Sequence, residues 1–163
     1  MDYTTHYGSP LGGITLASDE DALIGLFFDG QKHFGSTMGS QTEERADLHV
    51  FDKVRHWLDV YFSGNNPDFN PPFSFRGTAF QLRVWKALLA IPYGQTVTYG
   101  ELARRLGCRS AQAVGDAVRR NPISIIVPCH RVVGAGGALT GYAGGLDRKR
   151  AMLQLERKNY FAN

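Results

Sequence analysis

The chain begins with three short runs of apolar, aromatic and β-branched residues, at positions 3–7, 13–17 and 23–28. Ser-Pro-Leu-Gly separates the first two runs, and Ser-Asp-Glu-Asp separates the second from the third. Runs of this length that are bounded by turn-forming residues are typical of β-strands. We therefore predict an antiparallel sheet of three strands in this part of the chain.

Between residues 42 and 62 the apolar spacing changes to that of a helix with one buried face. The apolar side chains that share this face are Val50, Val54, Trp57, Leu58 and Tyr61. A Ser-Gly-Asn-Asn-Pro sequence then stops the pattern, and Pro71 and Pro72 suit neither a helix interior nor a central strand. We therefore expect a scaffold lobe over residues 1–74 and a second lobe over residues 75–163.

The second lobe shows the pattern of a helix-turn-helix. Thr78 and Gln81 have the spacing of a capping box at the start of a first helix. Two shorter helices are predicted over residues 98–106 and 110–120, joined by Gly-Cys-Arg and ended by Asn-Pro. Small side chains on the second of these two helices would allow its backbone to come close to DNA. The same side chains would also allow the helix to pack tightly against the protein's own core.

Three further segments complete the second lobe. Residues 123–127 form an apolar run that predicts a buried strand. Residues 134–145 hold six glycines, and a last helix is expected over residues 147–158.

The net charge of +3 hides a strong asymmetry along the chain. Residues 1–97 contain seven Lys and Arg against eleven Asp and Glu, whereas residues 98–163 contain eleven against four. A basic segment suits a polyanion, although a solvated surface of no special purpose would have the same composition. If the chain binds DNA, the C-terminal part is expected to face it.

Composition predicts a water-soluble protein of the cytosol. No apolar stretch is long enough to span a bilayer, and the first residues lack the basic start and apolar run of a secretory signal. With only Cys108 and Cys129, a disulfide framework is not expected, and both thiols should be reduced.

The Pro-Cys-His-Arg sequence at residues 128–131 is the most informative local feature. A free cysteine has a pKa of about 8.5, and cationic neighbours lower it, so Arg131 and His130 could favour a Cys129 thiolate. The alternative is an inert buried thiol beside a histidine used for packing. The other histidines are scattered in the N-terminal lobe without the spacing of metal ligands, so no metal site is expected.

The sequence around this feature resembles the active-site segment of the methylated-DNA–protein-cysteine methyltransferases. The resemblance rests on Ile-Val-Pro-Cys-His-Arg-Val-Val at residues 126–133, Arg-Asn-Pro at 120–122 and Gly-Tyr-Ala-Gly-Gly-Leu at 141–146. It covers residues 80–156 well and the N-terminal lobe more loosely. It implies an α/β (α+β) fold, with a small RNase H-like N-terminal lobe and a C-terminal winged-helix-like helix-turn-helix domain that carries the active site.

The resemblance also implies a reaction: a single, irreversible transfer of a methyl or small alkyl group from guanine O6 in DNA to Cys129. His130 would reach the thiol through a water molecule, Glu156 would orient His130, and Tyr142 would hydrogen-bond the flipped base. Nothing in the sequence suggests a route that regenerates the cysteine, and no cofactor is implied.

The resemblance assigns further residues to the substrate and to DNA. Those expected around the flipped nucleotide are Tyr99, which would push on its phosphate, and Asn121, Val118, Arg131, Val132 and Ala143. Those expected to face the minor groove of double-stranded DNA are Ala111, Gln112, Ala113, Gly115 and Arg119. The implied protein acts as a monomer, with cooperative binding along DNA left open.

Two positions depart from the family pattern, and both lie on the expected recognition helix. Gln112 stands where an arginine is usual, and Asp116 adds an acidic side chain near the phosphates. We predict weaker or more salt-sensitive DNA binding but retained alkyl transfer.

Three other functions are compatible with parts of the pattern. A non-catalytic relative that only binds alkylated DNA would lack the cysteine. A helix-turn-helix regulator would need long polar side chains that read bases, which are scarce on residues 110–120. A cysteine hydrolase would turn over many times, whereas alkyl transfer would yield one equivalent of covalent product.

Overall fold

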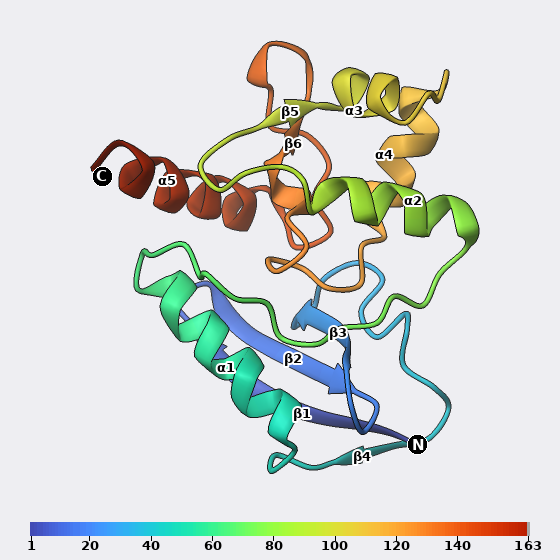
Figure 1. Ribbon diagram of the computed structural model, residues 1–163, viewed down its shortest axis with the longest axis vertical. Coiled ribbons are helices and arrows are strands. Elements are labelled where there is room, and N and C mark those ends of the chain that lie inside the picture. The colour runs from blue at the N-terminus through green and yellow to red at the C-terminus, as the bar shows by residue number, and fades with distance from the viewer. Residues whose placement is uncertain (163) are drawn as a thin grey trace.

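Two lobes lie one above the other in the computed structural model, which describes residues 1–162 and the side chains through Arg157 (Figure 1). The N-terminal lobe contains the strands β1 (Asp2–Ser9), β2 (Gly12–Ser18), β3 (Leu23–Phe28) and β4 (Thr42–Glu44), and the helix α1 (His49–Phe62). The C-terminal lobe contains α2 (Ala79–Leu88), β5 (Val97–Thr98), α3 (Tyr99–Arg105), α4 (Ala111–Arg119), β6 (Val132–Val133) and α5 (Leu146–Ala162). The predicted α/β (α+β) class and two-lobe arrangement are confirmed.

The N-terminal sheet has the strand order β3-β2-β1-β4. The three predicted strands pair antiparallel, whereas β4 pairs parallel with the start of β1. The predicted helix over residues 42–62 is wrong in its first part, because residues 42–44 form β4 and the helix begins at His49. The side chains of β4 are all exposed, so this edge strand carries no apolar alternation that sequence analysis could detect.

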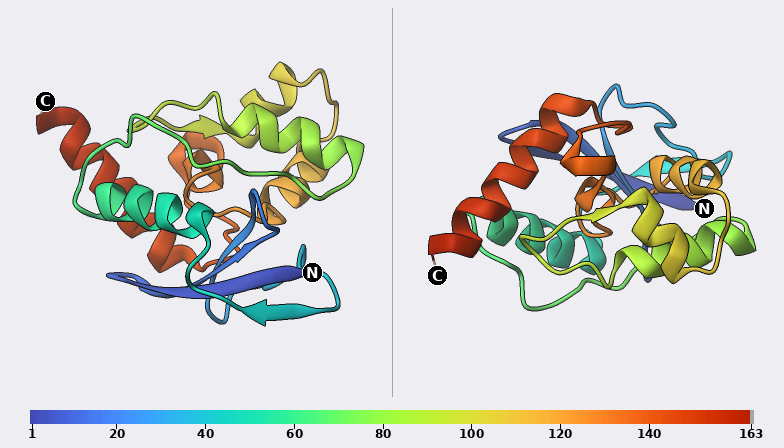
Figure 2. Two further views of the ribbon diagram at one scale, coloured as in Figure 1. Left: turned by 60° about the horizontal axis from the view of Figure 1, so that its bottom comes forward. Right: turned by 90° about the horizontal axis from the view of Figure 1, so that it is seen from above.

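Helix α1 covers one face of the sheet, as the turned views show (Figure 2). Its buried face contains the five predicted side chains, Val50, Val54, Trp57, Leu58 and Tyr61, together with Phe51. Burying such side chains contributes about 1.5–3 kcal/mol each. This packing fixes the direction of the last turn of α1, from which Tyr61 reaches the other lobe.

Each helix of the predicted helix-turn-helix begins with a hydroxyl cap. Thr98 Oγ1 accepts a hydrogen bond from the Glu101 amide at the start of α3, and Ser110 Oγ accepts one from the Ala113 amide at the start of α4. Such caps contribute roughly 1 kcal/mol each. The capping box of α2 also forms as predicted, so local sequence signals define all three helices.

The apolar run at residues 123–127 is not the strand that we expected. Ile123 makes one isolated bridge with Leu26, and the chain then turns at Ile125, whose φ is 71°. The Val127 amide donates to the Ile123 carbonyl at 3.1 Å, which closes the turn. Burial of the whole segment explains the apolar character of its four isoleucine and valine side chains, but a left-handed backbone at a β-branched residue cannot be read from sequence.

The two lobes are joined by backbone hydrogen bonds as well as by packing. The Leu26 amide donates to the Pro122 carbonyl at 2.8 Å, and the Ser124 amide donates to the Leu26 carbonyl at 3.1 Å. The Lys32 amide donates to the Ala143 carbonyl at 3.1 Å. The N-terminal lobe therefore supports the segments on both sides of Cys129.

No helix within residues 1–162 combines the length and the apolar character needed to cross a membrane.

Candidate active site

Cys129 lies at the start of a single 3-10 turn, Cys129–Arg131, which connects the buried turn at 123–127 to β6. Only 4% of its surface is exposed. Asn121 holds the preceding turn from inside: its Nδ2 donates to the Val127 carbonyl at 2.8 Å, and its Oδ1 accepts from the Ile123 amide at 3.0 Å. The thiol is therefore placed by a rigid, buried backbone.

His130 points away from solvent and is held by α5. Its Nε2 lies 2.5 Å from Glu156 Oε2, and both side chains are buried. Because a carboxylate accepts hydrogen bonds, Nε2 carries the proton and Nδ1 of the neutral ring is unprotonated. Nδ1 is buried and has no hydrogen-bond partner among the described residues.

Glu156 accepts four hydrogen bonds. Its Oε2 also accepts from Tyr61 Oη at 2.6 Å, and its Oε1 accepts from Arg131 Nε at 2.7 Å and from the Gly94 amide at 3.2 Å. Burial alone would raise the pKa of this carboxyl, but the hydrogen bonds from His130 and Arg131, together with the charge of Arg131, lower it well below its usual range. Glu156 is therefore a fixed anion.

The pKa of Cys129 is raised, which corrects our expectation of a favoured thiolate. Burial is the largest cause, while the amide of Asn121 and then the charge of Lys149 act in the opposite direction. Arg131, which we expected to lower the pKa, instead binds Glu156 and donates from Nη1 to the Ile91 carbonyl at 2.8 Å. A buried thiol of this kind reacts only when a base removes its proton.

Burial is also the main cause of a lowered pKa at His130, which favours its neutral form. The charge and hydrogen bond of Glu156 oppose that effect, and Arg131 and Lys149 reinforce it. A neutral imidazole with an unprotonated Nδ1 can accept a proton.

Lys149, which we had not singled out, is the cation that most lowers the pKa of Cys129. It is fully buried in α5, and its Nζ donates to the Val132 carbonyl at 2.6 Å and the Thr140 carbonyl at 2.8 Å. Burial lowers its own pKa to about 8. Lys149 thus joins β6 to the glycine-rich loop.

Two tyrosines lie near the thiol: Tyr142 in the glycine-rich loop, and Tyr99 at the start of α3. Tyr142 Oη is buried and makes no standard hydrogen bond among the described residues, although Cys129 and Ser124 approach it closely enough to affect its pKa. Burial, followed by the charge of Cys129, raises that pKa well above its usual value. Tyr99 Oη lies 3.3 Å from the Gly141 carbonyl, so both hydroxyls can serve as donors.

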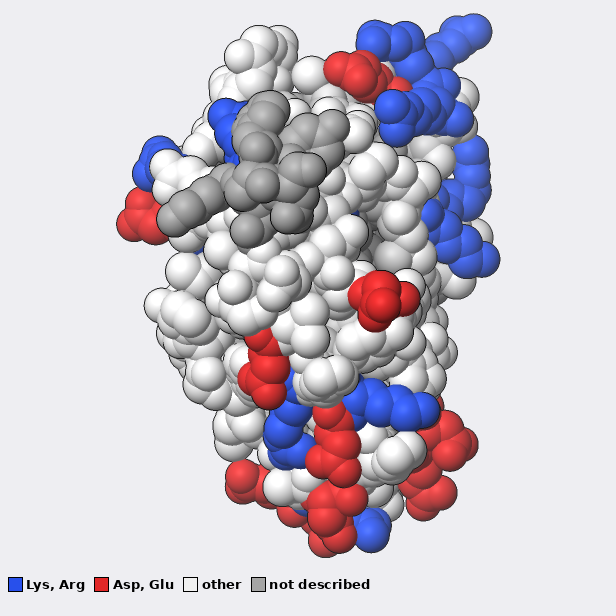
Figure 3. Space-filling model, turned by 60° about the vertical axis from the view of Figure 1, so that its left-hand side comes forward, with Lys and Arg blue, Asp and Glu red and all other residues white. Residues whose placement is uncertain are grey.

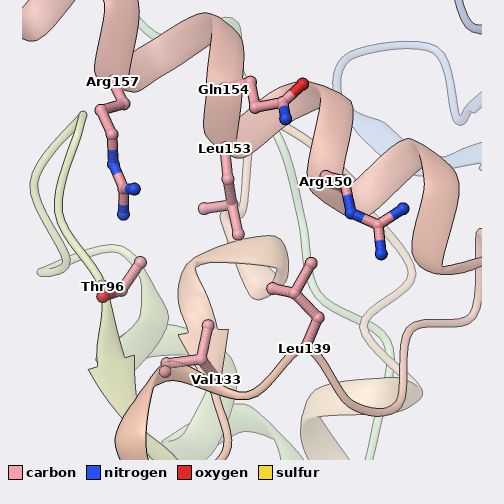
Figure 4. Close-up of a pocket in the computed structure, with 8 residues that line it drawn as sticks. Thr96, Val133, Leu139, Arg150, Leu153, Gln154 and Arg157 are labelled. Carbon is pink, nitrogen blue, oxygen red and sulfur yellow. The ribbon is translucent and has the colours of Figure 1, made fainter.

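A hollow of about 440 Å³ opens beside this loop. The residues that line it include Lys32, His33, Arg119, Tyr142 and Ala143. A second hollow, of about 290 Å³, lies between α5 and β6 and is shown in Figure 4. Arg150, Leu153 and Arg157 extend toward it from α5, but it is lined by none of the predicted site residues. The first hollow is therefore the candidate entrance to the site.

Helix α4, the expected recognition helix, exposes only some of the residues that were predicted to face DNA. Ala111 and Gln112 are exposed and Ala113 is half-buried, whereas Gly115 is buried beneath the side chain of Arg119. A Cβ at Gly115 would lie 3.2 Å from Arg119 Nη1, so a glycine leaves room for this side chain. Basic side chains gather over the upper part of the molecule and acidic ones over the N-terminal lobe, as one face shows (Figure 3).

Val118 and Val132 are buried in the same core as Cys129. Both side chains are almost wholly enclosed in this structure. No group of three or more His, Cys, Asp or Glu side chains with the geometry of a metal site occurs within the described part of the chain.

Family models match both lobes. The 6-O-methylguanine DNA methyltransferase ribonuclease-like domain matches residues 3–75, and the DNA binding domain of the same enzymes matches residues 79–158. Together these matches cover nearly the whole chain.

Individual relatives agree with the family models. The chain is 48% identical over 150 residues to the methylated-DNA–protein-cysteine methyltransferase of Mycobacterium bovis, covering 91% of this chain and 88% of the relative. It is 43% identical to the enzyme of that name from Haemophilus influenzae, covering 97% and 88%. The crystal structure of Mycobacterium tuberculosis OGT in complex with DNA superposes with a TM-score of 0.87 at 44% identity, covering 96% and 94%.

Proposed function

Because the chain belongs to the methylated-DNA–protein-cysteine methyltransferase family, whose members repair DNA directly by alkyl transfer, we propose that Cys129 is its alkyl acceptor. The observation that carries this assignment is the buried arrangement of Cys129, His130 and Glu156. The substrate is DNA that contains O6-alkylguanine, and each molecule reacts once. The division between the scaffold lobe and the DNA-binding lobe falls between residues 74 and 75.

The chemical step is a displacement at a saturated carbon. The Cys129 sulfur forms a bond to the alkyl carbon as the bond between that carbon and guanine O6 breaks. The bonding electrons pass to guanine, which overall gains the proton that the thiol loses. The product is a thioether, which no group in the site can cleave, so turnover ends there.

His130 is the base in this proposal. Its Nδ1, which has no partner among the described residues, accepts the thiol proton through a bridging water, while Nε2 remains bound to Glu156. The raised pKa of Cys129 supports the need for such a base. Arg131 serves the site by holding Glu156 at 2.7 Å.

Tyr142 donates a hydrogen bond to the flipped guanine. Its buried hydroxyl, without a standard partner in the described structure and close to Cys129, supports this role, because a donor aimed at the ring stabilises the negative charge that develops on guanine. Val118, Val132 and Ala143 form the walls of the base site, and Asn121 keeps its floor rigid.

DNA binds across α3 and α4 through the minor groove in this proposal. The alkylated oxygen cannot be reached inside a base stack, so the nucleotide must rotate out of the duplex. Tyr99 assists by pressing on its phosphate, Gln112 fills the gap that the base leaves, and Arg119 contacts the backbone. Ala111 and Ala113 let α4 approach the groove, and Gly115 leaves room for the side chain of Arg119. The protein acts as a monomer.

Intact-protein mass spectrometry tests the proposal. Incubation with a duplex carrying one O6-methylguanine should add one methyl group, about 14 Da, and should stop at one equivalent. The gain should vanish in Cys129→Ser and persist in Cys108→Ser, which is the matched control. Transfer that persists in Cys129→Ser, or that continues beyond one equivalent, would contradict the assignment.

A further inference from the structure

Tyr61 is the one residue of the N-terminal lobe whose side chain hydrogen-bonds Glu156 among the described residues. It lies in the last turn of α1, is fully buried, and donates from Oη to Glu156 Oε2 at 2.6 Å. The same oxygen binds His130 Nε2 at 2.5 Å. The Tyr61 and His130 rings meet edge to face with centroids 6.4 Å apart. Two donors from different lobes therefore converge on one oxygen.

Sharing one oxygen couples the two donors. A hydrogen bond donated to a carboxylate partly neutralises its negative charge. The bond from Tyr61 therefore reduces the degree to which Glu156 stabilises a protonated His130. The bond also fixes Oε2 in space and with it the plane of the imidazole. Burial, followed by the charge of Glu156, raises the pKa of Tyr61 well above its usual value, so the hydroxyl stays a donor.

We propose that Tyr61 is a positioning residue for alkyl transfer, and that its hydrogen bond to Glu156 sets both the orientation and the proton affinity of His130. The inference rests on the proposed role of His130 as the base. It gives the N-terminal lobe a part in the chemistry, because an atom of α1 adjusts a group that acts on Cys129.

Other groups also act on His130 and determine the sign of the effect. Glu156 favours the imidazolium, whereas Arg131 and Lys149 disfavour it. Removing the hydroxyl of Tyr61 leaves these three in place and leaves Glu156 Oε2 with His130 as its one remaining described donor. The pKa of His130 should therefore rise, and a larger share of molecules should hold a protonated base at low pH.

The test is Tyr61→Phe, which keeps the ring and removes the hydroxyl. We would measure the single-turnover rate of methyl transfer against pH, and the titration of the His130 ring by NMR in the DNA-free protein. The pH of half-maximal rate and the His130 titration should both shift upward by about one unit. At pH values below both midpoints the rate should fall roughly tenfold, and the loss should become smaller as the pH rises above them.

Tyr7→Phe is the matched control, because Tyr7 Oη donates to Asp59 of the same helix and not to Glu156. Its pH profile should equal that of the wild type. If Tyr61→Phe lowers stability or rate but leaves both midpoints unchanged, Tyr61 is only structural and the inference fails. If His130→Asn keeps the wild-type rate and profile, the proposed base itself fails, which separates the two outcomes.

Discussion

The two buried ionised side chains of α5 are compensated differently. Glu156 accepts four hydrogen bonds and has Arg131 as a counter-ion. Lys149 instead donates to two backbone carbonyls, with the ring of Tyr99 5.9 Å away. Carbonyl dipoles compensate a buried cation less completely than a carboxylate does. Lys149 therefore lowers the stability of the folded protein. We explain its presence by its effect on Cys129, whose pKa it lowers.

This cost predicts a particular pH dependence. The pKa of Lys149 is about 8 in the folded protein and 10.5 ordinarily, so between these values the unfolded chain binds more protons. The free energy of unfolding should therefore rise from pH 8 to pH 10 relative to a variant without this group. At pH 7 the buried charge of Lys149 lowers the free energy of unfolding by about 3 kcal/mol.

Urea unfolding of wild type and Lys149→Met at several pH values measures the effect. The difference in unfolding free energy between the two should change steadily over that window and level off below it. The exposed Lys53→Met serves as the control and should parallel the wild type. A difference that is constant from pH 7 to pH 10 would show that Lys149 keeps its ordinary pKa.

How far the site could be predicted depends on where each side chain's partner lies. Cys129 and His130 stand together in one motif, and the family resemblance supplied Glu156. Tyr61 was predicted only as part of the apolar face of α1, because its hydroxyl meets Glu156 95 residues further along the chain. Lys149 sits among other basic residues of α5, and nothing in that run distinguishes the buried one.

Helices and strands were predicted correctly where a local signal defines them. The capping box of α2 and the hydroxyl caps of α3 and α4 are such signals, and all three form. The segment at 123–127 was misread because its four apolar residues are buried by a turn that depends on Asn121 and on β3. That turn is stabilised by tertiary contacts, which periodicity does not report.

Helix α4 carries an ion pair that bears on DNA binding. Arg119 Nη2 lies 2.5 Å from Asp116 Oδ1, so the acidic residue neutralises a cation that we propose contacts the phosphate backbone. Replacing Asp116 by Asn removes the negative charge while keeping the shape of the side chain. The variant should bind DNA several-fold more tightly at low salt, and its affinity should depend more steeply on salt, by about one unit of the log–log slope. Of the two outcomes that the sequence predicts for Asp116, its pairing with Arg119 thus favours weaker binding over greater salt sensitivity.

Fluorescence anisotropy with a labelled duplex at several salt concentrations provides the measurement. Asp147→Asn is the matched control, because Asp147 forms the same i,i+3 pair with Arg150 on α5, away from α4. It changes the net charge equally. If both variants gain affinity to the same extent, the effect is one of overall charge and α4 has no special place in binding.

At the scale of the molecule, the two lobes differ in charge but share one core. The hydrophobic cluster runs from β1 through α1 and α2 to Cys129 and Met152 without a break. The acidic N-terminal lobe therefore stiffens the site while remaining unsuited to a polyanion, which leaves the basic lobe to bind DNA (Figure 3). The sequence predicted this division of charge but not the shared core.

A shared core also predicts that reaction destabilises the whole protein. A methyl group on Cys129 enters a closely packed interior beside Asn121, and an added methylene in such a site typically costs about 1–3 kcal/mol. The melting temperature of the alkylated protein should therefore be lower by roughly 3–10 °C. Scanning calorimetry after one equivalent of O6-methylguanine duplex, compared with unmodified duplex, would show it. Equal melting temperatures would mean that the site accommodates the methyl group without strain.

The near-complete enclosure of Cys129 has a consequence for the supply of usable protein. A molecule that reacts once is lost whenever its thiol meets an oxidant or a small electrophile instead of damaged DNA. With 4% of its surface exposed and a raised pKa, Cys129 offers little thiolate to the solvent, whereas the half-buried Cys108 is more accessible. Because Cys129 reacts slowly with oxidants and small electrophiles, molecules with a free thiol remain available until a lesion forms.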